Sequence, residues 1–183
     1  MGTGSVRRRA QLAWLRPDLT FGDLRGNVET RLRKAPSFDA IVVAAAALRR
    51  LGRTQVIDEV LDPAVVLPQV GQGALAVECR ADDEGVRAAL ARIDHLPSRR
   101  AVEAERAYLR EIGEGCQLPV GALATIGAGG RITVTGMIAS LDGVTLLRHV
   151  DTGADGVAVG RAVARHLLDE GGAAALLSEL DAS

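Results

Sequence analysis

The stretch Phe38–Gly52, FDAIVVAAAALRRLG, constrains the fold more than any other part of the chain. It begins as a continuous apolar run with β-branched residues, which is typical of a parallel strand buried on both faces. The run then passes into helix-forming residues, and Gly52 ends that helix. A strand that leads directly into a helix predicts a parallel sheet, with the loops at the strand ends available for ligands.

The preceding residues repeat this order of elements. Residues 5–15 have apolar side chains at helical spacing and are followed by Pro17, Asp18–Leu24 reads as a short strand, and Val28–Lys34 reads as a helix that ends before Pro36. The chain opens on a glycine-rich turn that runs straight into a helix, although such turns normally follow a strand. We therefore expect that an N-terminal part of the protein precedes Met1.

The second half of the chain has a different pattern. Ala74–Cys79 looks like a strand inside a segment rich in proline and glycine. The predicted elements that follow are a short helix at 82–91, a helix capped by Ser98 and running to Ile112, strands at 121–126, 131–140 and 144–152, and helices at 155–170 and up to 180. The predicted fold is α/β: a partial parallel-sheet lobe (1–68), a crossover segment (69–94) and a small α+β domain (95–183) with an antiparallel three-stranded sheet.

Composition excludes several classes of function. A net charge of −1 over 183 residues gives no overall attraction to nucleic acid or to a membrane, and an aromatic content of 2% leaves no platform for stacking bases. The longest apolar run, Ala40–Leu48, is too short to span a bilayer, and no export signal opens the chain. Two cysteines do not form a disulfide framework, and the three histidines are scattered, so we predict a cytoplasmic protein without a metal site.

The first candidate site is the helix start at Ser5, Arg7 and Arg8. Small residues there leave backbone N–H groups free, the serine adds a hydroxyl, and the helix dipole favours an anion. Two adjacent arginines would suit an acidic ligand. An N-cap serine followed by a solvated basic face explains the same residues, and spacing alone does not decide between the two interpretations.

The second and third candidates are turns. Arg25 precedes the Gly26-Asn27 turn at a predicted strand end and Arg31 lies in the next helix, so the two arginines could bind carboxylates; two ordinary surface arginines are the alternative. Gln72 lies between two glycines, which suits a crossover where the backbone approaches a ligand or another domain. A plain turn is equally compatible with that sequence.

The fourth candidate is Cys116, in the segment EGCQLPVG. It follows Gly115, which we expect to end the long helix, and a thiol on a loop is accessible. Cys79 alternates with apolar residues, and we expect it to be buried. Since no histidine or second cysteine lies near Cys116 in the sequence, neither zinc binding nor a nucleophilic hydrolase is indicated. The thiol is an attachment point or has no function.

Six motifs in register extend these observations over nearly the whole chain. They are GTGSVRRRAQL, LRGNVETRL, FDAIVVAAAALRRLG, LPQVGQGALAVECR, AERAYL and GEGCQLPVGA. In order and spacing they resemble porphobilinogen deaminase, also called hydroxymethylbilane synthase. That family has three α/β domains, of which the first two resemble the lobes of periplasmic-type binding proteins and the third carries a cofactor cysteine on a loop.

The resemblance implies a chemistry for these residues. Cys116 would carry a dipyrromethane cofactor through a thioether, and four porphobilinogen units would add to it in turn with loss of ammonia before a linear tetrapyrrole is released. Every ring bears an acetate and a propionate, so the ligand accumulates carboxylates. The residues expected to bind them are Arg7, Arg8, Arg25, Arg31 and Arg50, together with Ser5, the backbone at Gly26, and Gln72 at the crossover between domains.

Two departures from the family qualify this picture. Gly4 stands where the family usually has a second serine. The family's N-terminal domain, with its catalytic aspartate, would lie ahead of Met1, and residues 74–79 would normally complete that domain. We therefore expect this chain to contain no catalytic residue of the family and to need a separate chain that supplies the rest, although the family is otherwise monomeric. The alternative is a non-enzymatic, anion-binding lobe of the periplasmic-receptor type.

Overall fold

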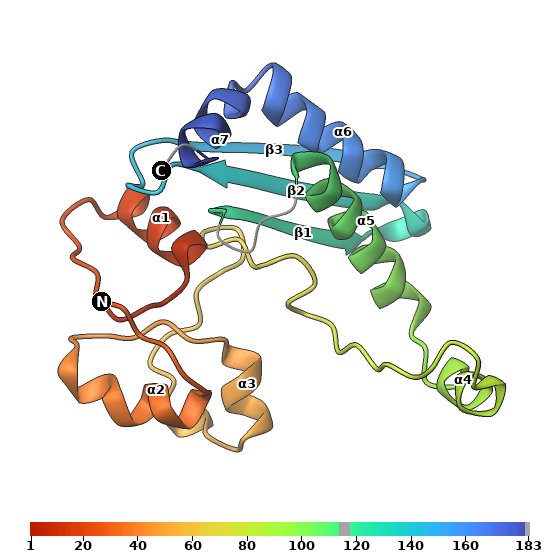
Figure 1. Cartoon of the computed structure of the whole chain (residues 1–183), viewed down its shortest axis with the longest axis horizontal. Coiled ribbons are helices and arrows are strands. Elements are labelled where there is room, and N and C mark those ends of the chain that lie inside the picture. Colours follow the sequence, from red (N-terminus) through yellow and green to blue (C-terminus); the bar gives the residue numbers. More distant parts are fainter. Residues whose placement is uncertain (114–117, 182–183) are drawn as a thin grey trace.

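The computed structural model describes residues 1–113 and 118–181 (Figure 1). The fold is a mixture of helices with one three-stranded antiparallel sheet, and the order of elements is as follows: α1 (Val6–Leu15), α2 (Val28–Lys34), α3 (Ala45–Arg50), α4 (Glu84–Ala91), α5 (Leu96–Ile112), β1 (Val120–Ile126), β2 (Ile132–Ala139), β3 (Leu146–Gly153), α6 (Gly156–Asp169) and α7 (Ala173–Asp181). The predicted helices and the antiparallel sheet are thereby confirmed. No helix in the described part of the chain has the length and apolar character needed to cross a membrane.

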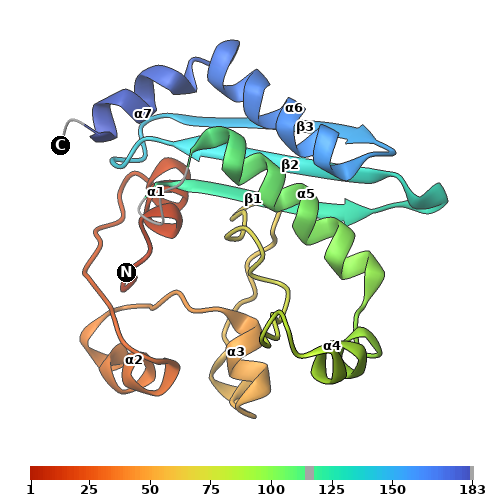
Figure 2. The ribbon, with the colours of Figure 1, turned by 45° about the vertical axis from the view of Figure 1, so that its right-hand side comes forward.

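The sheet forms a meander with strand order β1-β2-β3 and both pairs antiparallel. Alternation along β2 places Ile132, Val134 and Ile138 on the face covered by α5 and α6, where all three are buried. The turn from β2 to β3 contains Gly143 with φ of 76°, as expected for a glycine in a tight hairpin connection. The main core of the molecule therefore lies between this face and the two helices (Figure 2).

Helices α5 and α6 cross each other closely over the sheet. Gly160 makes this possible, because a Cβ at that position would lie 2.2 Å from the carbonyl oxygen of Ala104. Tyr108 is fully buried beneath the crossing, and its hydroxyl donates a hydrogen bond to the Met137 carbonyl 2.9 Å away. This bond satisfies the only polar atom of a side chain that otherwise fills the core.

Helix α1 packs against the opposite face of the sheet from α5 and α6 (Figure 2). A second, smaller cluster joins Ala10 of α1 and Leu67 to Met137 and Ala139 of β2. The hairpin after β2 also contacts α1, since a Cβ on Gly143 would lie 2.5 Å from that of Ala13. The N-terminal helix with its candidate anion site is thus attached directly to the C-terminal sheet.

The predicted parallel strands of the N-terminal half are reduced to single bridges. Gly2 pairs in parallel with Gly22 on one side and Ile41 on the other, so three chain segments run side by side. The Phe38 ring covers this point, because a Cβ on Gly22 would lie 2.6 Å from it. Each segment contributes too few paired residues to form a strand, which corrects the predicted strands at 18–24 and 38–43. The order of turn and helix after each segment is as expected.

Three local expectations were wrong. Cys79 is exposed, because residues 74–80 have no neighbouring strand and Leu75 is 83% exposed. The N-cap residue of α5 is His95 rather than Ser98, and the helix begins at Leu96. A proline fits the first turn because its missing N–H would have no hydrogen-bond partner there. Ser98 donates its backbone N–H to the His95 side chain. The helix runs to Ile112 as predicted, but its C-cap residue is Gly113, with φ of 104°, rather than Gly115.

Candidate functional site

The three parallel segments place three helix starts on one side of the N-terminal half. After Gly2 the chain turns into α1, after Gly22 it turns into α2, and after Ile41 it turns into α3. In such an arrangement ligands bind outside the carboxyl ends of the strands. Ser5, Gly26 and Val42 all lie in these turns.

Ser5 is the N-cap residue of α1. Its hydroxyl accepts a hydrogen bond from the backbone N–H of Arg8 at 3.4 Å, and its own N–H donates to the Thr3 hydroxyl at 3.2 Å. The side chain therefore has the capping role that one interpretation of the sequence expected. Because the serine is only half-buried, its hydroxyl proton remains available to an acceptor from solvent.

Arg8 and Arg31 come together across this edge. Arg8 donates to the Val42 carbonyl at 3.1 Å, and Arg31 donates from Nε to the Gly26 carbonyl at 2.8 Å. Partial burial, followed by the positive charge of Arg31, lowers the pKa of Arg8. Within the described residues neither guanidinium pairs with a carboxylate, so both arginines keep donors available for an acidic ligand.

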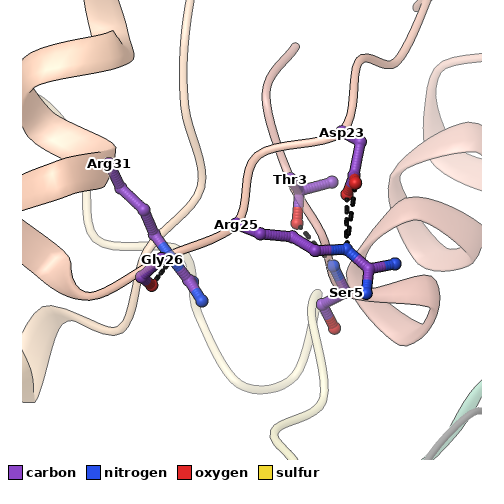
Figure 3. Close-up of polar contacts among 6 residues, drawn as sticks. All are labelled: Thr3, Ser5, Asp23, Arg25, Gly26 and Arg31. Carbon is purple, nitrogen blue, oxygen red and sulfur yellow. Dashed lines mark hydrogen bonds and ion pairs between the residues drawn. The ribbon is translucent and has the colours of Figure 1, made fainter.

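Arg25 extends from the turn before α2 toward Ser5, and Figure 3 shows it between Ser5 and the Gly26–Arg31 pair. Its Nε donates to both carboxylate oxygens of Asp23, at 3.2 and 2.9 Å. The arginine side chain is 81% exposed, so its other nitrogens face solvent. Gly26 follows with φ of 118°, a conformation that favours glycine and turns the chain toward Arg31.

Arg7 points away from this edge and into the protein. It is 3% exposed and donates to Leu67 O, to Gln69 Oε1 at 3.2 Å and to Gln72 Oε1 at 3.3 Å. Burial, with a smaller effect of Arg8, lowers its pKa to about 10. Gln11, one turn later in α1, accepts from the Leu67 N–H at 2.7 Å and donates to the Leu67 carbonyl. These bonds tie α1 to the segment that contains Gln72.

A buried carboxylate fixes the same segment from the other side. Glu105 of α5 accepts from the Gly71 N–H at 2.6 Å and from the Ala124 N–H at 2.9 Å, and it is 6% exposed. Burial raises its pKa, and the two backbone bonds oppose the shift. The turn at Gln72 is therefore held between an arginine of α1 and a glutamate of α5.

The remaining predicted site residues are less closely connected. Arg50 is exposed in the last turn of α3, and in the described structure no hydrogen bond or ion pair joins it to the other predicted residues. Cys116 lies outside the described residues. The described strand after it contacts the site, because a Cβ on Gly121 would lie 3.2 Å from Arg7 Cδ and 2.9 Å from the Pro68 carbonyl. Among the described side chains no cluster of three potential metal ligands occurs.

Two family models and several curated proteins match this chain. Residues 1–88 match the model "Porphobilinogen deaminase, dipyromethane cofactor binding domain", and residues 99–169 match "Porphobilinogen deaminase, C-terminal domain". The chain belongs to the porphobilinogen deaminase family. This confirms the family inferred from the six motifs, and it does not favour the alternative of a receptor-type binding lobe.

Relatives in the porphobilinogen deaminase family are about 50% identical to this chain over the aligned residues. The porphobilinogen deaminase of Roseiflexus sp. is 52% identical over 180 residues, covering 96% of this chain and 59% of the relative. Those of Moorella thermoacetica and Brevibacillus brevis are 50% and 47% identical, and the chain covers 59% and 56% of them. The chain therefore spans less than two thirds of the length of these family members.

Sequence reasoning missed two residues at this site. Glu105 occupies the face of α5 that also carries Ala101, Tyr108 and Ile112, and an acidic residue on a core-facing stripe is the signal that could have revealed it. Asp23 lies two residues before Arg25, within reach of its guanidinium, but no sequence pattern distinguishes it from other surface acids.

Proposed function

We propose that this chain is the cofactor-holding part of a porphobilinogen deaminase. Porphobilinogen would be its substrate, and the reaction would condense four such units with loss of four ammonia molecules to give hydroxymethylbilane. Cys116 would hold the dipyrromethane through a thioether, and when bound this cofactor supplies the pyrrole carbon that is extended. The match to the family's cofactor-binding and C-terminal domains supports the proposal.

The chemistry of the described side chains fits a ligand with many carboxylates. Neither Arg8 nor Arg31 has an acidic partner among the described residues, and a carboxylate bound near them would offset the burial and the positive charge of Arg31, which lower the pKa of Arg8. Ser5, Arg25 and the backbone at Gly26 line the same edge. These residues and Arg50 are proposed to bind and orient the acetate and propionate groups, while Arg7 and Gln72 are proposed to act at the crossover between domains.

We propose that the chain contains parts of two domains joined by a crossover segment. Residues 1–68 would form part of a lobe of the periplasmic-binding-protein type, residues 69–94 would cross to the family's N-terminal domain, and residues 95–183 would form the domain that carries Cys116. The exposed apolar side chains of Leu75 and Val77 support this assignment, since the crossover lacks a covering layer. A companion chain bearing the N-terminal domain is the proposed partner, and the cytoplasm is the proposed location.

The guanidinium groups of Arg8 and Arg31, which have no acidic partner among the described residues, carry this proposal. Its test is a binding titration. Arg31→Gln should weaken the binding of porphobilinogen to the 183-residue chain about tenfold, because a charge-assisted hydrogen bond contributes about 1.5–3 kcal/mol. Arg33→Gln is the matched control, since Arg33 is exposed in the same helix. Equal affinities of the two variants, or no binding by the parent chain, would contradict the proposal.

A further inference from the structure

One arginine of the proposed site already has an internal anion as its partner. Arg25 donates from Nε to both carboxylate oxygens of Asp23, and the pair lies beside Ser5, with Gly26 and Arg31 on the other side of Arg25 (Figure 3). Arg8 and Arg31, on the same edge, have no such acidic partner among the described residues. Among the residues drawn in Figure 3, Asp23 is paired with Arg25.

The position of this pair is fixed by the glycine before Ser5. A Cβ on Gly4 would lie 3.2 Å from Asp23 Oδ1, 3.1 Å from Arg25 Cγ and 2.8 Å from the Leu24 carbonyl. The carboxylate therefore rests over the turn that leads into α1, where the backbone N–H groups and the helix dipole favour an anion. Any ligand carboxylate that approaches Arg25 from this side meets Asp23 first.

From this geometry we propose that Asp23 is an internal competitor for the carboxylate that Arg25 binds. This inference rests on the proposed function, and it assigns to Asp23 the role of setting the affinity for acidic ligands. Without a ligand, the carboxylate neutralises Arg25 and holds its side chain over the α1 turn. An incoming carboxylate must displace Asp23 or share the guanidinium with it, so that bound ligand is held less tightly and exchanges faster.

The size of the effect follows from the exposure of the two partners. The Arg25 side chain is 81% exposed and that of Asp23 is 62% exposed, so water and salt screen their attraction. Removing the competing charge should therefore raise affinity about two- to five-fold at low salt, which is the range measured for exposed ion pairs. The gain should shrink as ionic strength rises.

The chain offers a closely matched control. Asp18 pairs with Arg16 at the other end of α1, also two residues apart, with side chains that are 62% and 63% exposed. Asp18→Asn and Asp23→Asn change the net charge of the chain equally. A general electrostatic effect would act in both variants, whereas competition for Arg25 would act only in Asp23→Asn.

The experiment titrates the 183-residue chain and both variants with glutarate, a simple dicarboxylate, and with porphobilinogen at two salt concentrations. The Arg25 Nε–H resonance reports directly on the pair, and it should shift in Asp23→Asn but not in Asp18→Asn. The expected result is a two- to five-fold gain in glutarate affinity for Asp23→Asn alone. Unchanged affinity, an equal gain in Asp18→Asn, or no detectable glutarate binding would overturn the inference. The expected gain in glutarate affinity together with no porphobilinogen binding would instead refute the proposed function and leave the competition demonstrated.

Discussion

Replacing Glu105 tests whether the crossover segment is held in place from the C-terminal domain. In the Glu105→Ala variant, the N–H groups of Gly71 and Ala124 both lose their acceptor. An unpaired buried donor costs about 1–3 kcal/mol, and water can reach the Gly71 group more easily than the Ala124 group. We therefore expect the free energy of unfolding to fall by about 3 kcal/mol. Glu105→Gln keeps one acceptor oxygen and should lose about half as much.

The assay is urea unfolding followed by far-ultraviolet circular dichroism, with the free energy of unfolding compared at constant slope. Glu103→Ala is the control, because Glu103 is exposed two positions away in the same helix and should change stability by less than about 0.5 kcal/mol. A loss in Glu105→Ala no larger than in this control would refute the reasoning, since it would mean that the two backbone bonds contribute nothing.

The pH dependence of the free energy of unfolding in the same variants tests independently whether the pKa of Glu105 is raised. Burial raises the pKa of Glu105 above its ordinary value of 4.5, so the native chain holds this proton more tightly than the unfolded chain does. The contribution of this group is therefore fully present below pH 4.5 and is lost as pH rises through the raised pKa. The stability advantage over Glu105→Gln should shrink as pH increases. An advantage that grows with pH would show that the backbone bonds outweigh burial.

Three other substitutions test the packing around the site. Gly160→Ala should destabilise the chain by about 3 kcal/mol, because its Cβ would meet the Ala104 carbonyl. Gly85→Ala is the control, since its Cβ would make only ordinary contacts, and it should be neutral or stabilising by about 1 kcal/mol. Urea unfolding measures both, and equal effects would contradict the close helix crossing. Tyr108→Phe should cost about 1–2 kcal/mol through a lost buried hydrogen bond, and an unchanged melting curve would contradict this. Arg7→Lys should lower the free energy of unfolding by about 1–3 kcal/mol, because a lysine ammonium cannot reach all three acceptors that the planar guanidinium of Arg7 contacts. Hydrogen exchange around residues 67–72 should also become faster.

Elements that depend on local pattern could be predicted from the sequence. The helical spacing of Ala104, Tyr108 and Ile112 predicted both α5 and the face that it buries. Alternating residues and a turn with Gly143 predicted the antiparallel hairpin of β2 and β3. The backbone hydrogen bonds of α5 and of this hairpin join residues close in the chain, and this is why their sequence pattern is sufficient even though α5 packs against the distant α6.

Elements that depend on distant partners were predicted less well. The segment around Ile41 has the composition of a buried strand, but only Gly2 bridges to it, and it does not form a strand. Cys79 alternates with apolar residues as a buried strand residue would, and it is exposed because no neighbour covers it. In both cases the local pattern requires a partner strand that the described structure does not place there.

The candidate site shows the same division. The basic residues near the turns were identified from the sequence, but their different environments depend on tertiary contacts. Arg7 is directed inward by the Leu67 carbonyl and Arg25 is paired with Asp23, whereas Arg8 and Arg31 donate to backbone carbonyls. No spacing rule distinguishes these arginines, because the distinction is made by which acceptors the fold brings near each guanidinium.

Peptide mass mapping after incubation with hydroxymethylbilane tests the central claim, that one sulfur anchors an acidic pyrrole ligand beside the arginines. The account predicts that the thiol displaces the bilane's hydroxyl as water, so that an adduct of all four pyrrole rings forms on the peptide containing Cys116; it should be lost in Cys116→Ser and persist in Cys79→Ser even though Cys79 is exposed. An adduct confined to Cys79, equal labelling of both thiols, or no adduct under conditions that load a full-length relative would contradict it.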